Sequence, residues 1–155
     1  MPQMNKGGKF IFGKSLIQND LSIHFPPQAI AEYNIKDEGK IFLFTGSKTT
    51  GGFCVTRKEL LAPSKLGHIL TNNPTLRDYQ TKEGEFIQYK GRAYCWINIS
   101  DKGIIHLNPE MMNYLDLKIG MELLSIRSSD IAFTMGAKGP LLEKSYLYQG
   151  TIDKY

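Results

Sequence analysis

Two stretches of this chain, about 82 residues apart, present the same succession of local structural signals. The first stretch spans residues 20–39 and the second spans residues 102–120. In each, a short apolar run carrying one His leads to Pro, then to an amphipathic helical segment, and then to a Gly before another apolar run. Such a repeat constrains the fold strongly, because each copy must form the same supersecondary unit from its own residues.

The repeat depends on the order of its elements rather than on any single identity. A helix can open at Pro in both copies, because a missing N–H costs nothing at the first helical position. Gly can then turn the chain, because it tolerates positive φ. The matched positions are Ile23 with Ile105, His24 with His106, Pro27 with Pro109, Gly39 with Gly120, and Leu43 with Leu124.

Each copy is predicted to contain four strands around one short helix. Branched and aromatic residues favour the strands, and Asn108 can cap the helix that opens at Pro109. The first copy is expected to form two hairpins, 10–17 with 22–25 and 40–45 with 53–56, around a helix from Pro26-Pro27 to Tyr33. The strands expected in the second copy are 92–99, 104–107, 121–127 and 131–135.

The repeats divide the chain without suggesting separate domains. No stretch has the low-complexity composition of a flexible linker, so we expect residues 1–155 to form a single unit. A short helix within 60–70 and an extra strand at 85–89 are expected between the copies. The predicted parts are a first repeat at 9–60, an irregular connector at 61–90, a second repeat at 91–142, and a C-terminal extension at 143–155.

One repeat of about 50 residues buries too little apolar surface to offset a chain entropy of order 1–2 kcal/mol per residue. Each copy therefore needs the other to cover its strands. We expect a mainly β fold with short helices, in which two ββαββ repeats form an intramolecular pseudo-dimer and strands of one copy pair with strands of the other. A further homodimer of such units is also possible.

The composition fits a globular protein, with 41% hydrophobic and 22% charged residues. No apolar run approaches the roughly 20 residues of a membrane span, and the first nine residues lack the apolar centre of a signal peptide. Cys54 and Cys95 stand alone in apolar runs and are expected to be reduced core residues. These features predict a cytoplasmic location without a membrane partner.

The second copy resembles the AbrB/SpoVT family of small bacterial and archaeal regulators and antitoxins. The residues that carry the resemblance are Asp101 to Met111, Tyr114 to Gly120, and Glu122 to Ile126. The resemblance covers about two-thirds of the chain when both copies are counted. It implies a swapped-hairpin fold in which two elements exchange hairpins, and a DNA-binding transcriptional regulator. Related duplicated elements also build cradle-loop barrels, so a closed barrel is the alternative architecture.

Basic residues beside the first strands of each copy are the DNA contacts that this resemblance implies. Residues 1–77 carry ten Lys or Arg against five Asp or Glu, whereas residues 78–155 carry nine against ten. The first part is thus +5 and the second −1, and a basic part is compatible with phosphate binding. The candidate contacts to double-stranded DNA are Lys9, Lys14, Lys48, Arg92 and Lys102.

Several positions where the family carries basic residues are not basic in this chain. Ser22 and Ile104 follow the Gly-turn positions, and Ile30-Ala31 and Met112-Asn113 occupy the helices. The residues that specify the fold therefore match the family better than the residues that contact DNA. The alternative function is a non-catalytic, barrel-like module that binds a ligand or a protein and no nucleic acid.

Candidate chemistry beyond this is sparse. His24 and His106 occupy equivalent strand positions, either as a paired metal or anion site or as ordinary half-exposed residues. The loop at 46–52 is either an anion-binding loop with Lys48 or a hairpin loop, because it lacks the order of a phosphate-binding motif. No nucleophile has a base at a recognisable spacing, so we expect no catalysis, cofactor or metal.

Overall fold

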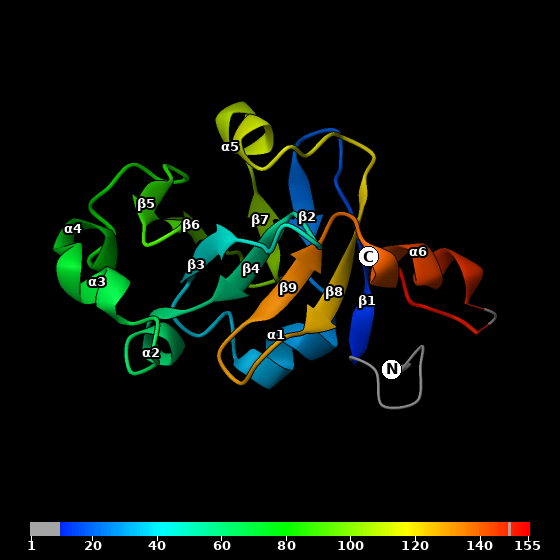
Figure 1. Cartoon of the computed structure of the whole chain (residues 1–155), viewed down its shortest axis with the longest axis horizontal. Helices are drawn as coiled ribbons and strands as arrows, with labels where there is room; N and C mark the ends of the chain where they lie inside the picture. The colour runs from blue at the N-terminus through cyan, green and yellow to red at the C-terminus, as the bar shows by residue number, and fades with distance from the viewer. Residues whose placement is uncertain (1–9, 149) are drawn as a thin grey trace.

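The computed structural model describes residues 10–148 and 150–155 (Figure 1). Its elements are β1 (Ile11–Leu16), β2 (Ser22–His24), α1 (Pro27–Tyr33), β3 (Lys40–Thr45), β4 (Phe53–Thr56), α2 (Lys58–Leu61), α3 (His68–Asn72), α4 (Pro74–Arg77), β5 (Ile87–Tyr89), β6 (Arg92–Asn98), β7 (Ile104–His106), α5 (Pro109–Tyr114), β8 (Glu122–Arg127), β9 (Phe133–Gly136) and α6 (Pro140–Leu147). The mainly β class with short helices is confirmed.

The strands form one seven-stranded sheet in the order β1-β8-β9-β4-β3-β6-β5 and one two-stranded sheet of β2 and β7. All neighbouring strands run antiparallel. The larger sheet ends at β1 and β5, which do not pair with each other. The described strands therefore form an open sheet, and the closed-barrel alternative is wrong.

Four strand pairings join residues 9–60 to residues 91–142: β1 with β8, β3 with β6, β4 with β9, and β2 with β7. The pairing scheme is symmetric between the two segments. If β1 to β4 are exchanged in order with β6 to β9, the pairing of β1 with β8 becomes the pairing of β6 with β3, and the other two pairings are kept. The predicted pairing of 10–17 with 22–25 is wrong. One edge of β1 is taken by β8 and the other by residues 153–155, so β2 leaves the larger sheet and pairs with β7.

The predicted match of Leu43 with Leu124 is wrong by one position. Leu43 faces the main core, whereas Leu124 packs in a separate cluster with Ile11 and Leu142 on the other face of the sheet. Ser125, the next residue, lies on the core side and donates to the sulfur of Met135. Successive strand residues point to opposite faces, so a slip of one residue in the alignment exchanges the two faces.

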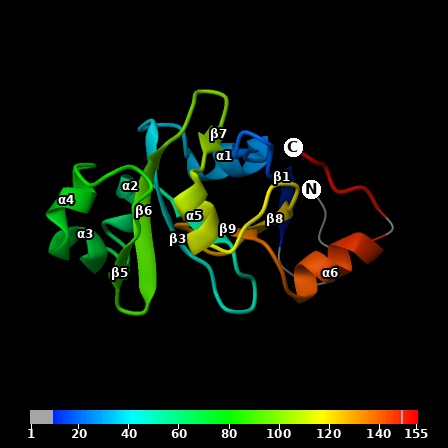
Figure 2. The same cartoon turned by 90° about the horizontal axis from the view of Figure 1, so that it is seen from above.

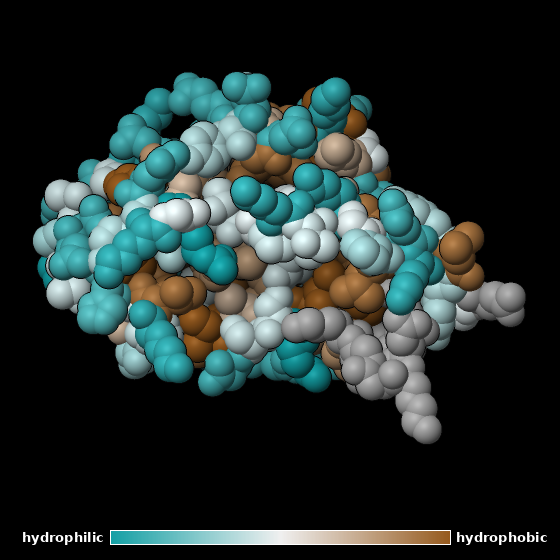
Figure 3. All heavy atoms as spheres, viewed as in Figure 1, coloured by the Kyte–Doolittle hydropathy of each residue, from teal (hydrophilic) through white to brown (hydrophobic). Residues whose placement is uncertain are grey.

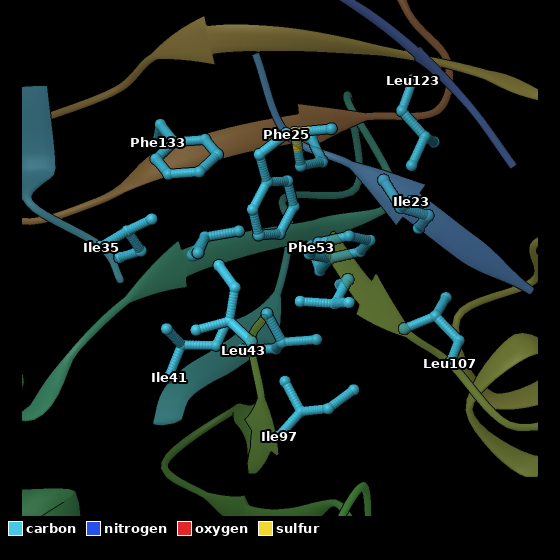
Figure 4. Packing of buried hydrophobic residues seen from close by; sticks show 14 of the residues in the cluster. Ile23, Phe25, Ile35, Ile41, Leu43, Phe53, Ile97, Leu107, Leu123 and Phe133 are labelled. Carbon is cyan, nitrogen blue, oxygen red and sulfur yellow. The ribbon is translucent and has the colours of Figure 1, made fainter. Parts of the chain in front are cut away.

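The main core lies between one face of the sheet and a layer that contains the β2–β7 pair and the helices α1 and α5 (Figure 2). Both segments supply its side chains, as Figure 4 shows for Phe25 and Leu43 beside Phe133 and Leu123. All four are fully buried. Burial of one such side chain contributes roughly 1.5–3 kcal/mol, so each segment supplies stability that the other segment needs.

The helix α5 begins as the sequence predicts. The Asn108 side chain accepts a hydrogen bond from the Met111 backbone N–H at 2.8 Å, and Pro109 occupies the first helical position. Met111 and Met112 are then buried against the core. The cap thus fixes the point at which the strand β7 gives way to the covering helix.

The outer face of the sheet is covered at its two ends. At one end Leu61, Ile69 and Leu76 pack on Phe42 and Trp96. At the other end α6 places Leu142 beside strands β1 and β8. Figures 1 and 2 show α2 to α4 at one side of the sheet and α6 at the other. The strip between them carries the candidate site.

Gly52 tests the pairing between the two segments, because it lies where β4 meets β9. A Cβ at Gly52 would lie 2.0 Å from the Met135 carbonyl oxygen, and φ there is +60°. Gly52→Ala should therefore lower the free energy of unfolding by about 3 kcal/mol, from left-handed strain and from separation of the strands. Urea denaturation measures this loss.

Gly39→Ala is the matched control. Its φ is +70°, but no atom lies within 4 Å of the added Cβ. This substitution should cost only the backbone strain, about 1 kcal/mol. Equal losses for the two variants would show that close approach of β4 and β9 does not govern stability.

A candidate ligand site on the outer face of the sheet

A cavity of about 390 Å³ opens on the outer face, between the α2–α4 end and α6. Figure 3 shows hydrophobic residues exposed on this face of the molecule. The lining residues come from β3, β4, β6, β8 and β9, from the loops that follow β3 and β8, and from the helical segments that cover the two ends of the sheet. They are Phe44, Ser47, Thr50, Cys54, Leu66, Arg92, Ile126, Ser128, Ser129, Ile131, Ala132, Thr134 and Leu141.

The floor of the cavity is one row of paired strand residues. Phe44 pairs with Cys54, Cys54 with Thr134, and Thr134 with Ile126. Directly paired residues in an antiparallel sheet point to the same face, so all four side chains reach the cavity side. The Cys54 sulfur lies 3.4 Å from the Thr134 hydroxyl, which also hydrogen-bonds the Ser128 hydroxyl. The floor is therefore apolar at its ends and weakly polar at its centre.

The loop at 46–52 forms one rim of the cavity. The Thr50 carbonyl accepts hydrogen bonds from Ala137 N at 2.8 Å and Lys138 N at 3.0 Å. Within the loop, Gly51 N donates to the Ser47 carbonyl at 2.8 Å. These bonds fix the loop against the end of β9, and Ser47 and Thr50 contribute to the lining while Lys48 is exposed.

Arg92 is the only charged side chain among the described residues that line the cavity. Its guanidinium carbon lies 5.3 Å from the centre of the Phe44 ring, and Nη1 lies 3.4 Å from the Thr45 carbonyl oxygen. No carboxylate in the described part of the chain lies within salt-bridge distance of it. The charge is therefore available to a ligand. Arg92 also borders a smaller cavity of about 260 Å³ with Gln88 and Tyr114.

Cys54 is a buried thiol at the centre of the floor. Burial raises the pKa of this thiol above its ordinary value, and the Thr134 hydrogen bond and the positive charge on Arg92 only partly oppose that rise in pKa. The thiol is therefore protonated near neutral pH and is a weak nucleophile.

The cavity continues in two directions. A hollow of about 750 Å³ beside α2 shares Leu66, Ser129 and Ile131 with it, and a smaller one of about 160 Å³ under α6 shares Ile126 and Leu141. The outer face thus carries a groove between α6 and α2, and the cavity is its middle part. Lys138 lines the part under α6, and Glu59, Lys65 and Asp130 line the part beside α2.

The predicted DNA contacts do not form one cluster among the described residues. Lys48 and Arg92 lie where β3 ends and β6 begins. Lys102 lies beyond the opposite end of β6, and seven residues of strand span about 20 Å. Lys9 lies outside the described residues.

Lys14 is buried rather than displayed. It is 4% exposed, and its Nζ lies 4.0 Å from the centre of the Tyr146 ring. Burial is the largest cause that lowers the pKa of this ammonium, and the nearby Glu122 carboxylate opposes the change in pKa. The ammonium thus lies under α6 rather than on an open surface.

The two histidines lie at opposite ends of the β2–β7 pair. Ser22 pairs with His106, and His24 pairs with Ile104. His106 lies 3.7 Å from the Asp20 carboxylate, whereas the His24 ring contacts Tyr155. No group of three or more potential metal ligands occurs in the described part of the chain. The pair is not brought together as one site.

Sequence reasoning did not identify the groove. The alternation in Phe53-Cys54-Val55 and Phe133-Thr134-Met135 places the two middle residues away from the core. It could not show that β4 and β9 are neighbours, nor that α6 borders the strip beside them. Arg92 was predicted as a phosphate contact, and its place on the cavity rim depends on the pairing of β6 with β3.

No protein-family model and no curated protein matches this chain. None of the described helices is long and apolar enough to cross a membrane. We therefore infer function from the geometry of the groove and from the strand pairing.

The two cysteines provide a test of the open floor. Cys54 borders the cavity, whereas Cys95 is fully buried on the core side. Cys54 should react with a small thiol reagent at least about tenfold faster than Cys95 in the native protein. Its rate should still rise with pH beyond the point at which an ordinary thiol is fully ionised, because burial raises the Cys54 pKa.

Mass spectrometry of Cys54→Ser and Cys95→Ser proteins measures the two rates separately. Equal labelling rates would show that the thiols react only when the whole chain unfolds, and that the floor is closed in solution.

Proposed function

We propose that this chain is a non-catalytic ligand-binding module, and that its ligand is a small molecule with an apolar body and one anionic group. The observation that carries the proposal is the lone charge of Arg92 at the edge of an otherwise uncharged cavity. A single exposed cation at the rim of an apolar pocket, without a carboxylate partner, favours one negative group on the ligand.

The shape and chemistry of the cavity fit such a molecule. A volume of about 390 Å³ falls within the range of small-molecule sites. Phe44, Ile126 and Ile131 offer apolar contacts, and the hydroxyls of Ser47 and Thr50 offer hydrogen bonds at the rim. A carboxylate at this rim would receive paired N–H bonds from a guanidinium, which are stronger than bonds between neutral groups.

The lining supports binding rather than catalysis. The Cys54 thiol has a raised pKa, and the described lining residues include no His, Asp or Glu that could act as a base. A hydroxyl nucleophile needs such a base within hydrogen-bond reach. Ligand retention is therefore the function that these residues support.

We also infer that residues 9–60 and 91–142 form an intramolecular swapped-hairpin pseudo-dimer. Ile23 pairs with Ile105 and Cys54 with Thr134, so equivalent residues of the two segments meet at two places. A twofold axis brings equivalent residues together where it passes between them. An axis that passes through both the Ile23–Ile105 pair and the Cys54–Thr134 pair would reach the cavity floor. The two sides of the groove would then differ. The helices α2–α4 border one side and α6 borders the other, and the twofold axis does not relate these helices.

DNA binding of the AbrB/SpoVT type is the second candidate, and the exchange of strand partners between segments favours it. That exchange is the arrangement that the family resemblance implies. Lys48 and Lys102 are exposed and could contact phosphates. The burial of Lys14 and the distance between the other cations make this candidate the weaker one.

The test of the first proposal compares carboxylates with matched neutral compounds. Benzoate and octanoate should raise the melting temperature more than benzyl alcohol and octanol do, because a ligand that binds only the folded state stabilises it. Arg92→Gln should weaken carboxylate binding about tenfold or more, since a hydrogen bond to a charged group contributes roughly 1.5–3 kcal/mol. Calorimetric titration measures the affinities.

Lys48→Gln is the matched control, because Lys48 lies on the same rim and is not among the cavity-lining residues. It should leave carboxylate affinity unchanged. Equal weakening by both variants would indicate a general charge effect and contradict the proposal. A titration with random duplex DNA at about 50 mM salt provides the second arm. Binding of DNA without binding of any carboxylate would favour the second candidate.

A further inference from the structure

Residues 153–155 lie along the outer edge of β1. Lys14 N donates to the Asp153 carbonyl at 2.9 Å, Tyr155 N donates to the Lys14 carbonyl at 2.7 Å, and Leu16 N donates to the Tyr155 main-chain oxygen at 3.0 Å. Lys14 and Lys154 form a parallel bridge. Both views show the chain returning from α6 to β1 (Figures 1 and 2). This short segment thus pairs with the edge of β1 through one isolated bridge and the hydrogen bonds around it.

The side chains of residues 152–155 meet distinct features of β1 and its neighbours. Ile152 packs on the Ile11, Leu124 and Leu142 cluster, and the Lys154 ammonium lies 3.3 Å from the Glu122 carboxylate. These contacts favour an apolar residue at the first position of the segment, residue 152, and a basic residue at the third position, residue 154.

The aromatic residue at the fourth position lies over Gly13. A Cβ at Gly13 would lie 2.7 Å from a ring carbon of Tyr155 and 2.9 Å from the Asp153 carbonyl. Gly13 has a φ of +151° and lies at an irregularity in the pairing of β1 with β8. The edge is therefore shaped for close approach of an aromatic ring, which any larger residue at position 13 would block.

The β1 edge is covered in a different way from the matching edge of β6. The β6 edge is paired with β5, which precedes it directly in the chain. The β1 edge is covered by residues that follow α6, a helix whose Tyr146 and Leu147 are 58% and 82% exposed. Ile152 packs in the cluster of Ile11, Leu124 and Leu142, which is separate from the main core, so the segment can leave the edge without opening that core.

We propose that the outer edge of β1 is a strand-addition site for an extended segment of a partner protein. The partner segment would carry an apolar residue, any residue, a basic residue and an aromatic residue in that order. Residues 152–155 fill the site within the chain, and the partner displaces them. Main-chain hydrogen bonds supply the affinity, and alternate side chains supply the specificity, as in other proteins that bind peptides at sheet edges.

The intramolecular segment competes at a high effective concentration. Weakening it should therefore expose the site to an added peptide. The probe is a labelled peptide with the sequence of residues 150–155, Gly-Thr-Ile-Asp-Lys-Tyr. The full-length receptor carries Ile152→Ser and Tyr155→Pro, which remove an apolar contact and the N–H that donates to Lys14.

Fluorescence anisotropy should show that the peptide binds the double variant at least about tenfold more tightly than it binds the unmodified chain. A peptide with Pro in place of its Tyr should bind neither protein. Circular dichroism melts confirm that the double variant is folded. Equal binding to both proteins, or no binding to the folded variant, would overturn the proposal.

A charge exchange makes the test specific to this edge. Glu122→Lys in the double variant should weaken the peptide about two- to fivefold, and a peptide with Glu in place of its Lys should regain that loss. Loss without recovery would place the peptide elsewhere. Self-association of the double variant without peptide binding would also overturn the proposal, since the edge would then pair with a second copy.

Discussion

Strand pairing between residues 9–60 and residues 91–142 is the interaction on which the rest of the structure depends. In the larger sheet β1 has β8 as its strand neighbour, and β6 has β3 and β5. The pairing of β4 with β9 then joins the two halves into one sheet. Neither segment contains the neighbours that its own first strand needs, so the main-chain hydrogen bonds and the shared core form together.

The candidate ligand site results from this pairing and from the helices that cover the sheet, because α2–α4 cover one end and α6 covers the other. The β4–β9 pairing places Cys54 beside Thr134, and the covering elements leave the strip above them open. The pairing of β3 with β6 brings Arg92 to the rim. The same sheet exposes an edge at β1, which residues 153–155 cover. The cavity and this edge are thus separate consequences of one sheet.

Local chemistry was enough to predict many elements but not their neighbours. The Asn108 cap, the helix from Pro27 and the β3–β4 hairpin follow from short-range rules, and all are present. The partner of β1 was mispredicted, because the choice of neighbouring strands depends on contacts between residues far apart in the sequence, which no local signal encodes. The helix α6 was not predicted, and without it neither the groove border nor the docked residues 152–155 can be derived.

Expression of residues 84–155 alone tests the central dependence most directly. This fragment keeps β6, β8 and β9 but lacks β3, β1 and β4, which are their partners in the larger sheet. Circular dichroism melts and sedimentation should show either an unfolded chain or a dimer that supplies the missing strands from a second copy. A monomeric fragment with a cooperative melt would contradict the account.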